Sequence, residues 1–197
     1  KTFLKAAELL RATPQIFTKG FLVIGFPTET VGMLQDTVQL ALGMGLDWYP
    51  IQVLTPMPGT PIFKMMVDLG LLGDIPTTTL GKARTFSVGA VGSIQNRERS
   101  EKKKARVFHD VLAGDPSRVP NRAEMEDFWF TIDYRINYEC ILQMENSCKL
   151  RKKFLMLKEI CQRMTTDNAL GWLFLGILSH KLGEHREAVE AMSRARQ

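Results

Sequence analysis

The stretch Gly20-Phe21-Leu22-Val23-Ile24-Gly25-Phe26-Pro27-Thr28-Glu29-Thr30 decides the fold that this sequence predicts. Its apolar residues are consecutive rather than alternating, which is typical of a strand buried on both faces of a parallel sheet. A Gly-x-Pro turn ends the strand, and an amphipathic segment with helical spacing follows it. The stretch therefore predicts a β-α unit. Ligands of such units bind beyond the carboxyl end of the strand, where Gly25, Pro27 and Glu29 stand.

A second unit of the same kind follows the first. Residues 48–54 form another strand-like run, and a Pro-rich and Gly-rich turn over 55–61 separates it from a helical pattern over 62–72. Between the two runs, residues 30–45 carry apolar side chains at helical spacing. Because strand-helix-strand crossovers are right-handed, we predict that residues 20–25 and 50–54 are parallel neighbours joined by a crossover helix over 30–45.

Together the two turns resemble the second half of the radical S-adenosylmethionine (SAM) barrel. In that family the fifth strand ends in Gly-Phe/Leu-Pro-Gly-Glu-Thr and the sixth in Pro-x-Pro-Gly-Thr, as Gly25 to Thr30 and Pro56 to Thr60 nearly do. Thr28 departs from the pattern, because the family usually has Gly there. The sequence is most similar to the branch whose members carry a cobalamin-binding domain ahead of the barrel. The resemblance covers about residues 1–75.

The resemblance implies a binding site for SAM. By position, Val23 and Gly25 would flank the adenine, Leu54–Pro56 would form the opposite wall, and Glu29 would brace the loop. Glycine allows close backbone approach, and proline fixes the turn. The alternative is an ordinary β-α turn of any α/β barrel, without this ligand. The candidate cofactor-binding residues are Val23, Gly25, Pro27, Glu29, Leu54, Thr55 and Pro56.

The resemblance also implies an iron–sulfur cluster, whose ligands this sequence lacks. The family holds its cluster with a Cys-x3-Cys-x2-Cys loop, because iron in such clusters takes thiolate ligands. Cys140, Cys148 and Cys161 are too widely spaced for such a loop, so we interpret them as buried small hydrophobic residues and assign no metal ligand. We therefore expect a C-terminal fragment, inactive alone, of an enzyme that uses SAM, an iron–sulfur cluster and, on the branch resemblance, cobalamin.

Composition limits the remaining functions. Among 197 residues, 45% are hydrophobic and 24% charged, which is ordinary for a folded globular chain. No apolar run is long enough to span a bilayer, and three widely spaced cysteines suit a reducing compartment, so a cytoplasmic location is expected. The net charge of +5 is concentrated in Arg97–Arg106, which has no interleaved aromatic residues. We therefore do not expect nucleic-acid binding.

The C-terminal half is predicted to be helical. A linker over 76–96 precedes expected helices over 97–113, 121–144 and 147–164, the second of them capped by Asn121. Residues 168–197 resemble one tetratricopeptide (TPR) repeat, a helical hairpin that packs on its neighbours. The residues that carry this resemblance are Trp172, Leu175, Gly176, Leu182, Gly183, Glu184, Ala188 and Ala195.

The predicted fold class is α/β. The C-terminal portion of a partial TIM-like (β/α) radical SAM barrel over residues 1–75 would be followed by an all-α extension over 97–197. Two functions remain open at this point. The first is a radical SAM enzyme acting on a small-molecule or macromolecular substrate; the second is an interaction module whose C-terminal helices bind a protein partner. The sequence does not identify the substrate, the reaction or the oligomeric state.

Overall fold

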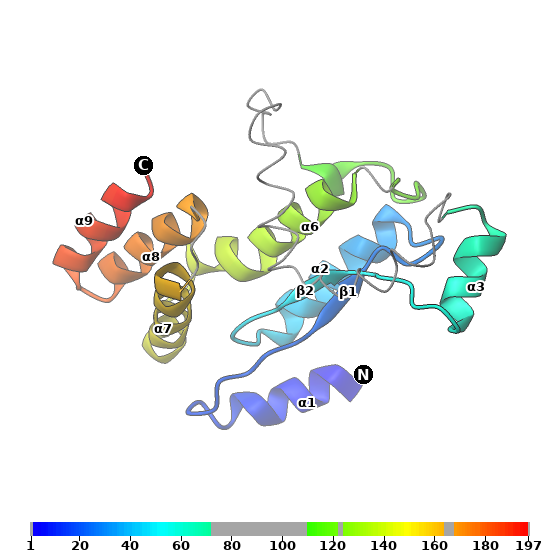
Figure 1. The fold of residues 1–197 in the computed structure, drawn as a ribbon. Coiled ribbons are helices and arrows are strands. Elements are labelled where there is room, and N and C mark those ends of the chain that lie inside the picture. The colour runs from blue at the N-terminus through cyan, green and yellow to red at the C-terminus, as the bar shows by residue number, and fades with distance from the viewer. Residues whose placement is uncertain (1, 72–109, 122–123, 164–167, 197) are drawn as a thin grey trace. The chain divides into compact units, whose positions relative to one another are not determined.

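A computed structural model describes residues 2–71, 110–121, 124–163 and 168–196 (Figure 1). This part of the chain is mostly helical with a two-stranded parallel sheet, which confirms a mixed α/β class. The chain divides into a first unit (Lys1–Gly20, Thr37–Pro50 and Ile132–Gln197) and a second unit (Phe21–Asp36 and Ile51–Thr131). None of the described helices has the length and apolar character needed to cross a membrane.

The elements of Figure 1 follow the predicted order in the N-terminal part. In chain order they are α1 (Thr2–Arg11), β1 (Leu22–Ile24), α2 (Val31–Met44), β2 (Ile51–Val53), α3 (Pro61–Asp68), the 3₁₀ turn η2 (Val111–Ala113), α6 (Met125–Asp133), the π-helical turn η3 (Tyr134–Tyr138), the 3₁₀ turn η4 (Glu139–Ile141), α7 (Ser147–Arg163), α8 (Ala169–Lys181) and α9 (His185–Arg194).

Strands β1 and β2 are parallel neighbours, as predicted, although both are shorter than expected. Leu22 is paired with Ile51 and Ile24 with Val53, and α2 connects the strands. The prediction that the strand is buried on both faces is wrong for this part of the chain. On one face Ile24 and Ile51 are buried, whereas on the other Val23 is 42% exposed and its partner Gln52 is exposed as well. Successive strand residues point to opposite faces, and within the described residues only one face is covered.

Within the described residues no third strand is present, and side chains bond backbone groups of β2 and of the residues just before it. In the first unit, the Asn137 carboxamide accepts from the Tyr49 N–H at 2.9 Å and donates to the Tyr49 carbonyl at 2.8 Å. In the second unit, the Trp129 indole N–H donates to the Ile51 carbonyl at 3.0 Å. These bonds satisfy backbone groups that a further strand would otherwise use.

The prediction of one continuous helix over 121–144 is wrong. The Asn121 side chain does accept from the Glu124 N–H at 3.2 Å, but α6 ends at Asp133 and is followed by η3 and η4. The fully buried Asn137 lies in the π-helical turn η3, and the buried Lys153 ammonium donates to its carbonyl at 3.1 Å. We attribute the interruption of the helix to these buried polar contacts. Buried polar groups must keep their hydrogen-bond partners, and here these bonds are kept instead of a continuous α-helix. The predicted helix over 97–113 lies mostly outside the described residues.

The C-terminal helices α7, α8 and α9 pack against one another in the first unit. The helix expected over 147–164 and the hairpin expected over 168–197 are both present (Figure 1). Gly176 allows α8 and α9 to approach closely, because an added Cβ would lie 2.6 Å from Met192 Cγ and 3.2 Å from the Ala188 carbonyl oxygen. The buried core of this unit contains Trp48, Tyr138, Ile141, Leu150, Phe154, Leu157, Cys161, Phe174, Leu175, Leu178 and Ala191.

Candidate functional site

The carboxyl ends of β1 and β2 form the candidate site, which lies in the second unit. The Leu54 N–H donates to the Ile24 carbonyl at 2.7 Å, directly beyond the last strand pair. Gly25–Glu29 and Leu54–Pro56 therefore leave the same edge of the sheet side by side. This is the edge where open parallel sheets bind ligands.

Gly25 begins a tight turn that the Glu29 carboxylate holds closed. Gly25 has φ +85°, a conformation that favours glycine. Glu29 Oε2 accepts from the Gly25 N–H at 2.6 Å and from the Phe26 N–H at 3.2 Å, and the Glu29 N–H donates to the Phe26 carbonyl at 3.0 Å. Burial raises the pKa of Glu29, and the two backbone bonds oppose that rise. The carboxylate thus braces the turn.

The structure gives Gly25 a different role from the one that its missing side chain suggested. An added Cβ would lie 3.3 Å from Val53 Cγ1 and 3.4 Å from Met125 Sδ. The space beside Gly25 is therefore filled by protein atoms. Glycine is needed here for its positive φ and for close packing against β2 and the start of α6.

The predicted site residues differ in their exposure. Val23 and Phe26 are each 42% exposed, and Val53, on the opposite face of the sheet from Val23, is 36% exposed. Gly25, Pro27, Glu29, Leu54, Thr55 and Pro56 are all half-buried. The strand ends thus present apolar side chains together with backbone polar groups, a combination that suits a flat organic ring.

Met125 is a site residue that the sequence did not reveal. It is 9% exposed, and its sulfur lies beside Gly25 and Val53. In the sequence it begins the apolar stripe of α6, which indicated only a core position. No periodicity connects Met125 with a glycine about a hundred residues earlier, so only the three-dimensional structure could identify it.

The N-terminus of α2, which follows the Glu29 turn, is closed by residues 110–118, called the strap below. The Val31 N–H donates to the Arg118 carbonyl and the Gly32 N–H to the Pro116 carbonyl, both at 2.8 Å. The Gln35 side-chain amide donates to the Leu112 carbonyl at 2.7 Å. The first amides of α2 are therefore already bonded within the chain.

The cysteines are free and do not form a ligand set. Cys161 is buried, as predicted, and burial raises the pKa of its thiol to about 11. Cys148 was predicted to be buried, and that prediction is wrong: it is exposed in the first turn of α7, while Leu150 and Phe154 take the buried positions. Cys140 is half-buried. Among the described residues, no three His, Cys, Asp or Glu side chains gather into a metal-binding group.

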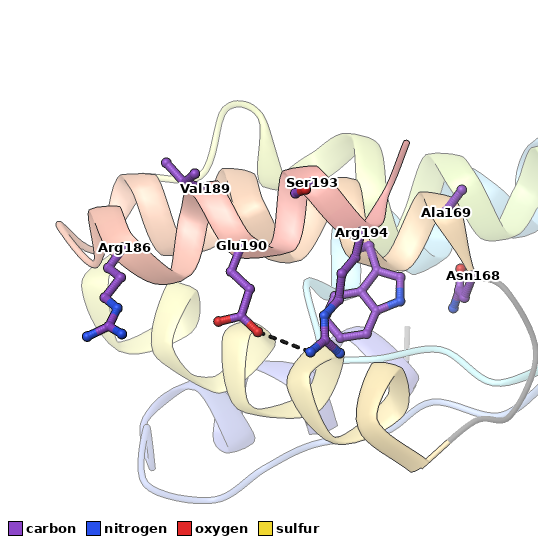
Figure 2. A pocket seen from close by; sticks show the side chains of 8 residues that line it. Asn168, Ala169, Arg186, Val189, Glu190, Ser193 and Arg194 are labelled. Carbon is purple, nitrogen blue, oxygen red and sulfur yellow. Dashed lines mark hydrogen bonds and ion pairs between the residues drawn. The ribbon is translucent and has the colours of Figure 1, made fainter. Parts of the chain in front are cut away.

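A separate hollow of about 760 Å³ lies on α8 and α9 of the first unit (Figure 2). The Arg194 guanidinium lies over the Trp172 ring, 4.8 Å from its centroid, and pairs with Glu190 at 3.1 Å. Val189 is 72% exposed on the same surface. Because its charged groups partly pair with one another around an aromatic ring, the hollow suits a contact surface better than a catalytic centre. Its lining residues are Asn168, Ala169, Trp172, Arg186, Val189, Glu190, Ser193 and Arg194.

Comparison with known proteins gives a partial relationship. The chain is 33% identical over 63 residues to a tRNA-2-methylthio-N(6)-dimethylallyladenosine synthase from Deinococcus radiodurans. The matched segment covers 32% of this chain and 12% of the synthase, so the chain spans only a small part of that relative's length. No family model matches the chain, and no solved structure matches it.

Proposed function

We propose that residues 1–75 are the C-terminal portion of a radical SAM barrel and that the ends of β1 and β2 contribute to SAM binding in a longer enzyme. One observation carries this proposal. The two segments that resemble the family's fifth and sixth strand ends, separate in the sequence, leave the same edge of a parallel sheet. A chance similarity of either turn would not require this pairing.

The chemistry of the strand ends fits SAM. Val23 offers an exposed apolar side chain, and the adjacent turn is held by Glu29 rather than by a ligand. Val23 and the backbone of Gly25 would form one wall for the adenine, and Leu54–Pro56 the other. Pro27 fixes the direction in which the turn leaves the strand. The residues of this chain would thus bind and orient the nucleoside and exclude water from it.

The comparison gives independent support. The Deinococcus radiodurans synthase is a tRNA methylthiotransferase of the radical SAM family. In that family, SAM and an iron–sulfur cluster supply a radical that abstracts hydrogen from the substrate. The cluster ligands would come from outside this sequence, and cobalamin rests on the branch resemblance alone. The substrate of the synthase is not carried over to this chain.

Calorimetric titration of SAM into the complete, cluster-loaded protein tests the proposal. We expect Val23→Ala and Leu54→Ala to weaken SAM binding by about tenfold, because each removes apolar contact worth about 1–2 kcal/mol. Leu42→Ala is the matched control, since Leu42 is 42% exposed on α2 and outside the site. Unchanged SAM affinity in both site variants, with the fold retained, would remove these strand ends from the cofactor site. Gly25→Val is unsuitable, because φ +85° would strain any β-branched residue.

Protein binding by α7–α9 is a second candidate function, favoured by the hollow of Figure 2 and by the exposed Val189. The two functions can coexist in one protein. Trp172→Ala would remove the aromatic floor of the hollow. If the helices bind a protein substrate, this variant should lose turnover of that substrate while its SAM affinity stays unchanged.

A further inference from the structure

The N-terminus of a helix that follows a parallel strand can bind phosphate. Its leading N–H groups have no partners inside the helix, and the helix dipole places partial positive charge there. In many nucleotide-binding β-α units, this terminus holds the phosphate of the ligand. Helix α2 stands in that position after β1, so its N-terminus decides whether a phosphorylated ligand can use the strand-end site.

The strap occupies this position with backbone carbonyl groups. The Val31 and Gly32 N–H groups donate to the carbonyls of Arg118 and Pro116 at 2.8 Å each. The next N–H, that of Met33, donates to the Thr30 hydroxyl at 3.3 Å. A phosphate would have to displace two short bonds and would meet carbonyl oxygens, whose partial charge is negative.

The strap is anchored at several points, so it is not easily displaced. The Arg118 guanidinium bonds both carboxylate oxygens of Glu124, at 2.9 and 2.7 Å, and lies over the ring of the fully buried Phe128. Leu112 is 3% exposed. The Asp115 carboxylate accepts from both the N–H and the hydroxyl of Ser117, which closes the strap's own turn.

Glycine at position 32 makes the close contact sterically feasible. An added Cβ would lie 3.1 Å from the Pro116 carbonyl oxygen and 3.3 Å from Pro116 Cβ. The charge around the strap also disfavours an anion. The Arg118 side chain is paired with Glu124, and hydrogen bonds from Ser117 lower the pKa of Asp115, which keeps that exposed carboxylate ionised.

We propose that the strap excludes phosphorylated ligands from the strand-end site, which therefore selects adenine nucleosides without phosphate. The choice of adenine nucleosides as ligands rests on the proposed function, whereas the closure of the α2 N-terminus by the strap does not. SAM carries no phosphate and would be accepted. AMP, ADP and ATP would be rejected, although they share its adenine and ribose.

The first experiment uses this 197-residue chain and inorganic phosphate. Amide resonances of Val31 and Gly32 are followed by NMR during phosphate titration. We expect no phosphate-dependent shift and slow hydrogen exchange at both amides. Saturable shifts at these two amides would overturn the closure, whether or not the complete protein binds SAM.

The second experiment measures displacement of SAM from the complete, cluster-loaded protein by adenosine and by AMP. We expect adenosine to compete at least about tenfold better than AMP. Equal competition would overturn the selectivity. Absence of SAM binding to the wild-type protein would instead refute the proposed function, and the phosphate titration of the chain would still decide the closure.

Gly32→Ala links the strap to the selectivity, because its Cβ must push Pro116 away. Gly43→Ala on the same helix is the matched control, since its Cβ would make only an ordinary contact of 3.7 Å with Leu4. We expect faster amide exchange at positions 31 and 32 and a smaller preference for adenosine over AMP in Gly32→Ala alone. An unchanged preference in a variant with faster exchange would show that the strap is not what excludes phosphate.

Discussion

Thr28 occupies a backbone conformation that its side chain disfavours. Its φ of 68° lies in the left-handed region, and it is the one non-glycine residue in the described part of the chain with positive φ. A β-branched residue there is a steric outlier. Positions of this kind cost about 1–3 kcal/mol and persist when the surrounding structure holds them. At Thr28 that structure is the turn braced by Glu29, which lies in the candidate site.

We therefore predict that Thr28→Gly stabilises the chain by about 1 kcal/mol. Relief of the strained φ should exceed the added entropy of glycine in the unfolded state, which is about 0.4–1 kcal/mol. Urea denaturation of this chain measures the difference. Thr30→Gly is the control and should destabilise, because the Thr30 hydroxyl accepts from the Met33 N–H. A loss of stability in Thr28→Gly would indicate that the threonine side chain makes a contact that outweighs the strain.

At single positions, the sequence was informative where only one or two residue types suit the backbone conformation. The Gly25-Phe26-Pro27 turn was predictable from its glycine and proline, whereas the positive φ of Gly25, +85°, is known only from the structure. The sequence could not show that Met125 fills the space beside Gly25. It also placed Cys148 in the core, because cysteine is usually buried, although the residue faces outward from the first turn of α7.

Among the elements, α6 ends at Asp133, directly before the π-helical turn η3, and the carboxyl group of this residue has an unusual pKa. Burial raises the pKa of Asp133 to about 6, against the opposing effects of the Asn137 hydrogen bond and the Lys153 charge. The Asn137 side chain donates to Asp133 Oδ1 at 2.7 Å, and Lys153 donates to the Asn137 carbonyl. Because the folded state binds this proton more tightly than the unfolded state, the group lowers stability as pH rises from about 4 to 6.

We predict that Asp133→Asn is more stable than the wild-type chain at pH 7 and nearly equal to it at pH 4. A shift from 3.8 to about 6 corresponds to at most about 3 kcal/mol, at about 1.4 kcal/mol per pKa unit. Denaturant unfolding of both chains across this pH range measures the effect as a difference. Asp36→Asn, at an exposed position on α2, is the matched substitution control. A pH-independent difference between Asp133→Asn and wild type would contradict the raised pKa.

Apolar spacing predicted elements well where a segment packs along one regular face. Helices α2 and α7 were found in this way, whereas the strands were predicted from consecutive apolar runs and the hairpin α8–α9 from its resemblance to a TPR repeat. The same pattern could not show that α6 ends at Asp133, because the helical stripe continues through Ile136 and Ile141, both of which are buried. The interruption depends on Tyr49, whose backbone Asn137 holds from a position 88 residues away in the sequence. Such long-range polar pairing leaves no periodic signal.

For the whole molecule, the sequence predicted the mixed class and the parallel pair, while the barrel and the domain boundaries stay predictions. The described residues form two units that are each discontinuous in sequence, with the break between them falling inside α2 and α6. Linker composition could not indicate this division, because the units are defined by packing of distant segments and not by a change of residue type.

We predict that this chain alone forms no 5′-deoxyadenosine from SAM, even after iron–sulfur reconstitution under reducing conditions. Its three cysteines stand at positions 140, 148 and 161, and they form no compact thiolate loop. Chromatography of the reaction mixture measures the product, with the complete protein as positive control. Formation of 5′-deoxyadenosine above a protein-free blank would contradict the interpretation of the chain as a fragment.

The side chains that bond the backbone beside β2 affect where a further strand could pair with the sheet. Trp129 donates a hydrogen bond to the Ile51 carbonyl, and the Asn137 side chain bonds both the N–H and the carbonyl of Tyr49. These backbone groups are therefore not available to pair with another strand. Within the described residues, β1 pairs with β2 alone, and Val23 of β1 and Phe21 directly before it are exposed. A strand added at β2 would have to displace the Trp129 indole from the Ile51 carbonyl, so we expect any added strand to pair with β1 instead.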